Sequence, residues 1–239
     1  MRFQHAVRLF LRRLGYDLVR YRADEHPLAR RARLLSRQRI SLVLDVGANS
    51  GQYGRELREL GYRGRIVSFE PLAAAFGELQ RSVRGDPAWE TRNFALGDAP
   101  GRTEINVAAN SYSSSLLGML PAHLAAAPHS RYVGREAIEV RTLDAIFPSL
   151  ARPEDRVHLK IDTQGFEKRV LAGAGASLAS IATLQMELSL VRLYEGESLL
   201  GEMLAHAAGL GFELVALEPG FSDPESGRLL QVDALFQRL

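Results

Sequence analysis

The sequence predicts an α/β domain built on an open, mostly parallel β-sheet. Three short stretches predict it, because each has the length and pattern of a strand and each leads into an acidic residue and a turn. They are residues 41–46 with Asp45, residues 65–69 followed by Glu70, and residues 156–161 followed by Asp162. The carboxyl ends of parallel strands share one edge of a sheet, so we expect these acids to converge there.

The composition is that of a folded protein with one principal domain. The chain has 239 residues, of which 46% are hydrophobic and 24% charged. It contains no cysteine, which excludes disulfides, thiolate metal sites and a cysteine nucleophile. No apolar run approaches the length of about 18 residues that a membrane span requires, and arginines interrupt the N-terminus too often for a signal peptide. A cytoplasmic protein is the expectation.

Positive charge gathers in residues 1–40, which we expect to form a basic helical arm before a domain of residues 41–239. Residues 1–41 hold eleven arginines and three acidic residues, a formal charge of +8, and the whole chain carries +2, so the remainder carries −6. An acidic body is poorly suited to binding nucleic acid. A second helix is expected over residues 27–39, with a solvated face formed by Arg30, Arg31, Arg33 and Arg37.

The first helix of the arm is amphipathic. Its apolar residues recur with helical spacing and are interleaved with arginines: Phe3, Val7, Phe10, Leu14 and Leu18. Such a helix covers the edge of a domain, makes a subunit contact in a homo-oligomer, or lies on an anionic membrane surface, where an apolar face and cationic flanks are both needed.

The turn after the first strand has the spacing of a nucleotide-type loop. Residues 41–51 read SLVLDVGANSG, with Asp45, Gly47, Asn49 and Gly51 in an acid-x-Gly-x-x-x-Gly pattern. A dinucleotide fingerprint requires G-x-G-x-x-G, which this loop lacks. An S-adenosylmethionine loop needs less, because no pyrophosphate lies against the helix, and Asn tolerates left-handed torsions. The alternative is an ordinary strand-to-helix turn.

The next unit is a helix over residues 53–60, closed by Gly61, and a strand over residues 65–69. Glu70 follows 25 residues after Asp45, about one strand-helix-strand unit. At the end of this strand, the Glu70 carboxylate can accept hydrogen bonds from both hydroxyls of a ribose, or it can cap the helix that starts near Leu72.

The segment after this helix predicts a hairpin on the flank of the sheet. Strands are expected within residues 90–96 and over residues 103–108, on either side of a dense turn signal at residues 97–101. Asn93 or Ala95 is expected near an adenine, whereas Asp98 either makes the turn or bonds the adenine amino group. The serine-rich loop 110–117 can bond a polyhydroxylated acceptor or its own backbone.

Residues 118–134, with His123 and His129, are consistent with a lid or an insertion over the site. A strand at 137–141 and a helix at 143–147 capped by Thr142 precede the third acid-ended strand. Lys160 shares a strand face with Asp162, and a partly buried lysine needs a carboxylate partner. The last expected elements are a strand at 183–188 containing Glu187, a helix at 199–208, and an antiparallel strand pair at 212–217 and 229–236.

Several motifs in order resemble the FkbM-type methyltransferases over residues 42–238. They are DVGANSG at 45–51, FEP at 69–71, NFALGD at 93–98, TLD at 142–144, LKIDTQGFE at 159–167, Glu187, and QVDALF at 231–236. The resemblance implies a class I, Rossmann-like methyltransferase fold with a seven-stranded sheet and an antiparallel last strand. It also implies an enzyme that uses S-adenosylmethionine to methylate a hydroxyl of a sugar, glycolipid, polysaccharide, or glycosylated or polyketide natural product.

The resemblance also assigns residues. The cofactor loop would be Asp45, Gly47, Ala48, Asn49 and Gly51, Glu70 would bind the ribose, and Asp162 would lie where the methionine end meets the acceptor. As the general base we expect Asp162, with His129 or His123 as the alternative. No metal is assigned, since Asp162 and Glu187 lack a third ligand.

Three other functions remain open from the sequence. A nicotinamide-dependent oxidoreductase would share the sheet and the ribose acid but not the glycine spacing. A non-catalytic binding module would show eroded loop motifs, and these are intact. An RNA methyltransferase would need a basic stripe beyond the arm.

Overall fold

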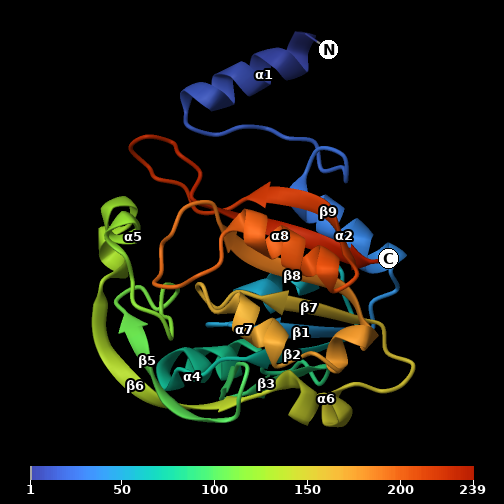
Figure 1. Cartoon of the computed structure of the whole chain (residues 1–239). Coiled ribbons are helices and arrows are strands. Elements are labelled where there is room, and N and C mark those ends of the chain that lie inside the picture. The colour runs from blue at the N-terminus through green and yellow to red at the C-terminus, as the bar shows by residue number, and fades with distance from the viewer. Residues whose placement is uncertain (1) are drawn as a thin grey trace.

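Seven strands form the central sheet, in the order β3-β2-β1-β7-β8-β10-β9 (Figure 1). The structure is a computed structural model that describes residues 2–239. β10 runs antiparallel to both of its neighbours and all other pairings are parallel, which confirms the predicted doubly wound sheet with an antiparallel last strand. The strands are β1 (Leu42–Val46), β2 (Arg65–Phe69), β3 (Trp89–Arg92), β7 (Val157–Ile161), β8 (Ile181–Ser189), β9 (Phe212–Pro219) and β10 (Gln231–Arg238).

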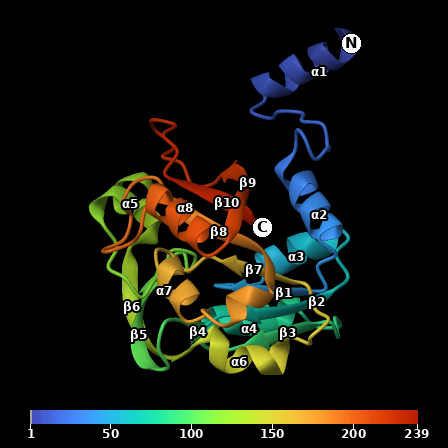
Figure 2. The same cartoon turned by 45° about the vertical axis from the view of Figure 1, so that its right-hand side comes forward.

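Helices cover both faces of this sheet (Figures 1 and 2). The helices α2 (Pro27–Arg37), α3 (Gln52–Glu59) and α4 (Ala73–Ser82) contribute Leu35, Leu57 and Leu79 to one apolar cluster. The helices α6 (Leu143–Leu150), α7 (Glu167–Ala172) and α8 (Leu200–Gly209) pack on the other face in the larger cluster. The predicted Thr142 cap is confirmed, because its side chain accepts from the backbone N–H of Ala145.

The two faces of β7 and β8 differ in polarity. Val157, Leu159 and Ile161 of β7 point into the larger apolar cluster, and Leu184, Met186 and Leu188 of β8 do the same. The alternate positions carry His158 and Lys160 on β7, and Thr183, Gln185 and Glu187 on β8. A strand buried on both faces is usually apolar throughout, so this polar row under α2 and α3 marks a specialised region.

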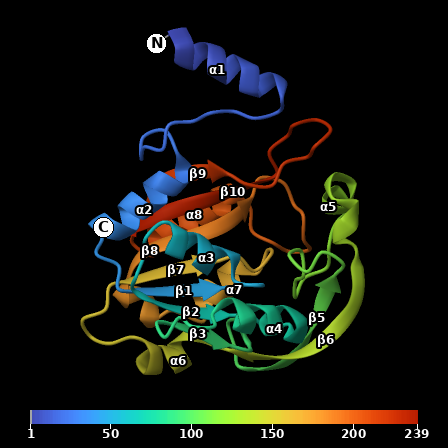
Figure 3. The same ribbon diagram turned by 180° about the vertical axis from the view of Figure 1, so that it is seen from behind.

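A second sheet of three strands lies beside the first and replaces the predicted hairpin (Figure 3). Both β4 (Ala95–Leu96) and β5 (Gly101–Ala108) pair with β6 (Tyr132–Arg141), β4 in parallel and β5 in antiparallel orientation. The hairpin prediction was wrong because the chain leaves the main sheet after β3, before the turn at residues 97–101, and both β4 and β5 pair with β6, much later in the sequence. The single strand expected within residues 90–96 is divided between β3 and β4 for the same reason.

The N-terminal arm has two parts that behave differently. Helix α1 (Arg2–Arg13) stands away from the sheet on an extended connection (Figures 1–3). Its apolar Leu9 and Phe10 are 47% and 61% exposed, and Leu14 and Leu18 lie beyond its end and are also exposed. The side chain of Phe3 is outside the described residues. Within residues 2–239, no helix is long and apolar enough to cross a membrane.

Helix α2, in contrast, packs on the domain and corrects one prediction. Arg31 is buried, whereas the sequence placed it on a solvated face. Its guanidinium pairs with Glu56 of α3 and, at 2.8 Å, with Glu218 of β9. Arg31 lies one turn before Leu34 and Leu35, so it shares the face that these leucines bury.

Candidate active site

A cavity of about 430 Å³ opens at the carboxyl edge of the parallel strands. It lies at the switch point between β1 and β7, where an open parallel sheet binds its ligands. Apolar side chains and Glu70 line one end: Phe69, Leu72, Phe94, Ala95, Leu96 and Ile105. Polar and charged side chains line the other end: Arg31, Gln52, Tyr53, Glu56, Lys160, Asp162, Gln164, Gln185, Glu187 and Asp233.

The glycine loop has torsions that its residues permit and that most others do not. Gly47 has φ +74°, and a Cβ on it would lie 1.9 Å from the backbone oxygen of Asp162. Asn49 has φ +46°, the left-handed conformation expected for it, and Gly51, at φ +89°, precedes the first turn of α3. The loop therefore holds the ends of β1 and β7 in direct backbone contact.

Glu70 connects this loop to the start of α4. One carboxylate oxygen accepts from the backbone N–H of Leu72 at 2.9 Å, and the other accepts from that of Asn49 at 2.9 Å. The carboxyl is buried, and burial raises its pKa to about 7, although these two hydrogen bonds lower it. Glu70 lines the cavity and is bonded at the helix start, so the two roles foreseen for this position are compatible in space.

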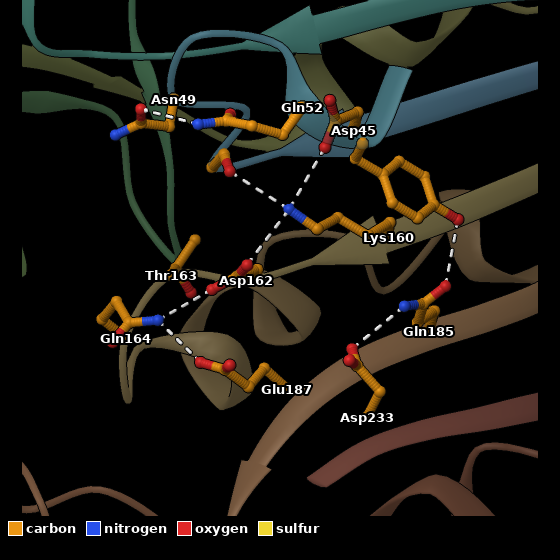
Figure 4. Close-up of polar contacts among 12 residues, drawn as sticks. Asp45, Asn49, Gln52, Lys160, Asp162, Thr163, Gln164, Gln185, Glu187 and Asp233 are labelled. Atoms are coloured by element: carbon orange, nitrogen blue, oxygen red, sulfur yellow. Dashed lines mark hydrogen bonds and ion pairs between the residues drawn. The ribbon is translucent and has the colours of Figure 1, made fainter. Parts of the chain in front are cut away.

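Lys160 is the cation at the centre of the site (Figure 4). Its Nζ lies 3.2 Å from Asp45 and 3.4 Å from Asp162, and it donates to the backbone oxygen of Gly47 at 3.1 Å. Burial alone would lower the pKa of Lys160, but Asp162 and Asp45 raise it above its usual value. The expected carboxylate partner is confirmed, and the lysine ties the loop after β1 to the turn after β7.

The turn after β7 positions Asp162 and Gln164. Gln164 adopts φ +56° and Gly165 adopts φ +93°, so this turn depends on a glycine at position 165. Glu167 accepts from the backbone N–H groups of Thr163 and Gly165, and burial raises its pKa to about 7. Asp162 lines the cavity with its side chain 34% exposed, and is therefore accessible to a ligand.

Gln164 uses both ends of its amide, and Figure 4 shows the contacts of its nitrogen. Its nitrogen donates to Asp162 at 2.9 Å and to Glu187 at 2.7 Å. Its oxygen accepts from the hydroxyl of Tyr194 at 2.7 Å, which fixes the orientation of the amide. The sequence placed Gln164 only in a turn, so this bridging role was missed.

A second polar group lies deeper, below α3. The hydroxyl of Tyr53 lies 2.8 Å from Nε2 of His158 and donates to Gln185 at 3.0 Å, and Gln185 donates to Asp233 at 3.0 Å. Sequence reasoning missed these residues as parts of a site. The available signal was the alternation of polar and apolar residues in strands expected to be buried on both faces.

Some of the candidate site residues lie behind the cavity. Asp45 is fully buried and accepts from Ser68 at 3.0 Å. Asn93 donates to the backbone oxygens of Glu70 and Pro71, both at 2.9 Å, so its amide supports the loop carrying Glu70. The cavity lining includes Gly47, Ala48, Asn49, Glu70, Ala95 and Asp162, but not Asp45, Gly51 or Asn93.

Neither histidine of the expected lid lines the cavity. His123 is buried beside Tyr194 and Phe221, and burial lowers its pKa to about 4. His129 is exposed. Ser111, Tyr112 and Ser114 of the serine-rich loop do line the cavity. Across the part of the chain that the structure describes, no cluster of three or more histidines and acids has a metal-binding arrangement.

Comparisons with known proteins point to methyltransferases. The model of the methyltransferase FkbM domain matches residues 45–214. The 2-O-methyltransferase NoeI of Sinorhizobium fredii is 28% identical over 184 residues, which cover 74% of each protein.

Solved structures show a related fold at low sequence identity. A putative methyltransferase from Thermobifida fusca aligns with a TM-score of 0.51 at 13% identity, over 88% of this chain and 78% of its own. An uncharacterised protein from Listeria monocytogenes aligns with a TM-score of 0.50 at 10% identity, over 89% of this chain and 66% of its own.

Proposed function

The chain belongs to the FkbM methyltransferase family, and we propose that it transfers a methyl group from S-adenosylmethionine to a hydroxyl of a sugar, glycolipid, polysaccharide or similarly hydroxylated natural product. The observation that carries this proposal is the cavity with one apolar end beside Glu70 and one polar end around Asp162. The likeness to a 2-O-methyltransferase supports oxygen as the acceptor atom. The family favours methyl transfer over the oxidoreductase and binding-module alternatives.

The lining of the cavity fits the cofactor. Phe94, Leu96 and Ile105 offer apolar surface for an adenine, and the buried Glu70 carboxylate can accept hydroxyls of a ribose. The methionine end would then lie near Asp162 and the Gly47 loop, where Lys160 offsets the negative charge of two carboxylates. When bound, S-adenosylmethionine supplies an electrophilic methyl group.

The protein's contribution to the reaction is alignment and proton transfer. A sugar hydroxyl is a weak nucleophile near neutral pH, so a carboxylate that accepts its proton assists the attack. Asp162 is suited to this role because it is held on one side by Lys160 and on the other by Gln164, yet remains open to the cavity. Holding the acceptor oxygen in line with the methyl group accounts for most of the remaining acceleration.

The arm is suited to an anionic membrane surface. Leu9, Phe10, Leu14 and Leu18 are exposed, and the arm carries the excess of arginine over acid. The full-length protein should co-sediment with phosphatidylcholine–phosphatidylglycerol vesicles and not with pure phosphatidylcholine vesicles. Phe10→Ser should weaken this binding, whereas Val133→Ser, at a position equally exposed on β6, should not. Equal binding to both vesicle types would reject the electrostatic part of this proposal.

The acceptor class is tested by methyl transfer itself. The protein is incubated with methyl-labelled S-adenosylmethionine and a panel of glycolipid extracts, polysaccharides and simple methyl glycosides, and products are read by mass spectrometry. We expect one labelled methyl group on a carbohydrate oxygen, with Asp162→Asn retaining cofactor binding and losing turnover by at least about 100-fold. Labelling of RNA or of nitrogen in place of a sugar oxygen would refute the proposal.

A further inference from the structure

Glu187 is a second carboxyl at the acceptor end of the cavity, and its surroundings differ from those of Asp162. It lies on β8 beside Asp233 of β10 and lines the cavity. One of its oxygens, Oε2, accepts from the amide nitrogens of Gln164 at 2.7 Å and Gln231 at 3.0 Å. No described residue donates to the other oxygen, Oε1, which leaves it available to a ligand.

The two carboxyls also differ in their counter-charge. Asp162 is paired with Lys160 at 3.4 Å, whereas Glu187 has no cationic side chain within 4.0 Å among residues 2–239. The charged groups that act most strongly on Glu187 are all negative, namely Asp162, Asp233 and Glu167. A partly buried carboxyl with negative neighbours is more stable neutral than ionised.

Gln164 holds the two groups together. Its single amide nitrogen donates to both, at 2.9 Å to Asp162 and 2.7 Å to Glu187, so both carboxyls lie around one point of the cavity (Figure 4). The two carboxyls are therefore close enough for a single ligand to contact both.

We propose that Asp162 and Glu187 form a two-carboxyl cradle for adjacent hydroxyls of the acceptor, in which ionised Asp162 accepts from the reacting hydroxyl and protonated Glu187 donates through Oε1 to its neighbour. The acceptor is then a vicinal diol, and the methylated oxygen is the one next to a free hydroxyl. This inference rests on the proposed function and narrows its substrate class.

The protonation of Glu187 is consistent with its partial burial and its acidic neighbours. Burial, followed by the nearby charges of Asp162, Asp233 and Glu167, raises the pKa of Glu187 well above its usual value, while the Gln164 hydrogen bond lowers it. Pairs of carboxyls whose environments separate their protonation states are a recurring arrangement at sites that need one donor and one acceptor.

Three variants, Glu187→Gln, Glu187→Ala and Asp162→Asn, test the cradle. In Glu187→Gln the amide oxygen can accept from Gln164 and Gln231 while its NH₂ group donates into the cavity, so activity should remain within about threefold of the wild type. Glu187→Ala, which removes the donor, should lose about tenfold or more in kcat/KM for the acceptor with unchanged affinity for S-adenosylmethionine. Asp162→Asn should lose far more than Glu187→Gln. A Glu187→Gln variant as impaired as Glu187→Ala, with its circular dichroism spectrum intact, would overturn the proposal.

A measurement on the protein alone provides an independent readout. Carboxyl-labelled glutamate gives a ¹³C NMR signal for Glu187, which is assigned by its disappearance in Glu187→Gln, with Glu78→Gln as an exposed control. We expect the signal of a protonated carboxyl at pH 7, and an ionised carboxylate would overturn the proposal. Because this experiment needs no acceptor, its failure is distinguishable from failure to detect methyl transfer, which bears on the proposed function.

Discussion

Replacement of Gly47 by alanine tests whether the contact between the loops after β1 and β7 determines the shape of the site. Two effects should lower the free energy of unfolding. An alanine at φ +74° costs about 1–2 kcal/mol in backbone strain. Its Cβ would also lie 1.9 Å from the backbone oxygen of Asp162, which cannot move aside as a flexible side chain would, and such overpacking costs about 1–3 kcal/mol.

Gly61 is the matched control for this prediction. It has φ +89°, but a Cβ there would meet no atom within 4 Å. Gly61→Ala should therefore lower the free energy of unfolding by the strain alone, about 1–2 kcal/mol, and Gly47→Ala by about 2–5 kcal/mol. Urea denaturation followed by circular dichroism measures both. Only Gly47→Ala should also weaken S-adenosylmethionine binding, and equal losses of stability in the two variants would refute the close-contact argument.

Three further outcomes follow from the same contacts. Arg31→Met should lower the free energy of unfolding by about 3–5 kcal/mol, because it leaves the buried Glu218 carboxylate without its closest partner. Arg33→Met, at an exposed position of the same helix, should change it by less than about 0.5 kcal/mol, and urea denaturation measures both variants. Burial raises the pKa of Glu70 from 4.5 to about 7 in the native state, so between these pH values the native state binds more protons than the unfolded state. The free energy of unfolding should therefore fall as pH rises through this window, and its dependence on pH should be flatter in Glu70→Gln. Gln164→Ala should lower kcat at least about tenfold, because the amide orients Asp162, whereas the affinity for S-adenosylmethionine measured by calorimetry should stay constant, because Gln164 does not line the adenine end. A loss confined to cofactor affinity would contradict this.

Local sequence patterns were sufficient to predict the three strands that carry the site. Each acid-ended strand was correctly expected, because a short stretch with a strand pattern followed by a turn indicates a strand and the position of its carboxyl end. The partner of Lys160 was also foreseeable, since a buried lysine near an acid-rich sheet edge requires one.

Long-range contacts account for what the sequence did not reveal. The hairpin prediction relied on the turn at residues 97–101, but the pairing of β4 and β5 is decided by β6, more than 30 residues after that turn. The residues around Arg31 have the composition of a surface helix, and its burial is favourable only because Glu56 and Glu218 lie within reach of its guanidinium. The bridging role of Gln164 likewise depends on Tyr194 and Glu187, which come from later segments.

The most direct test of the account is a calorimetric titration of S-adenosylmethionine into the wild-type protein and into Glu70→Ala. We expect one cofactor per chain for the wild type and binding weakened about tenfold or more in the variant, because the carboxyl that accepts from the ribose hydroxyls is lost. Unchanged affinity in Glu70→Ala, or preferential binding of a nicotinamide dinucleotide by the wild type, would contradict the placement of the cofactor at this edge of the sheet.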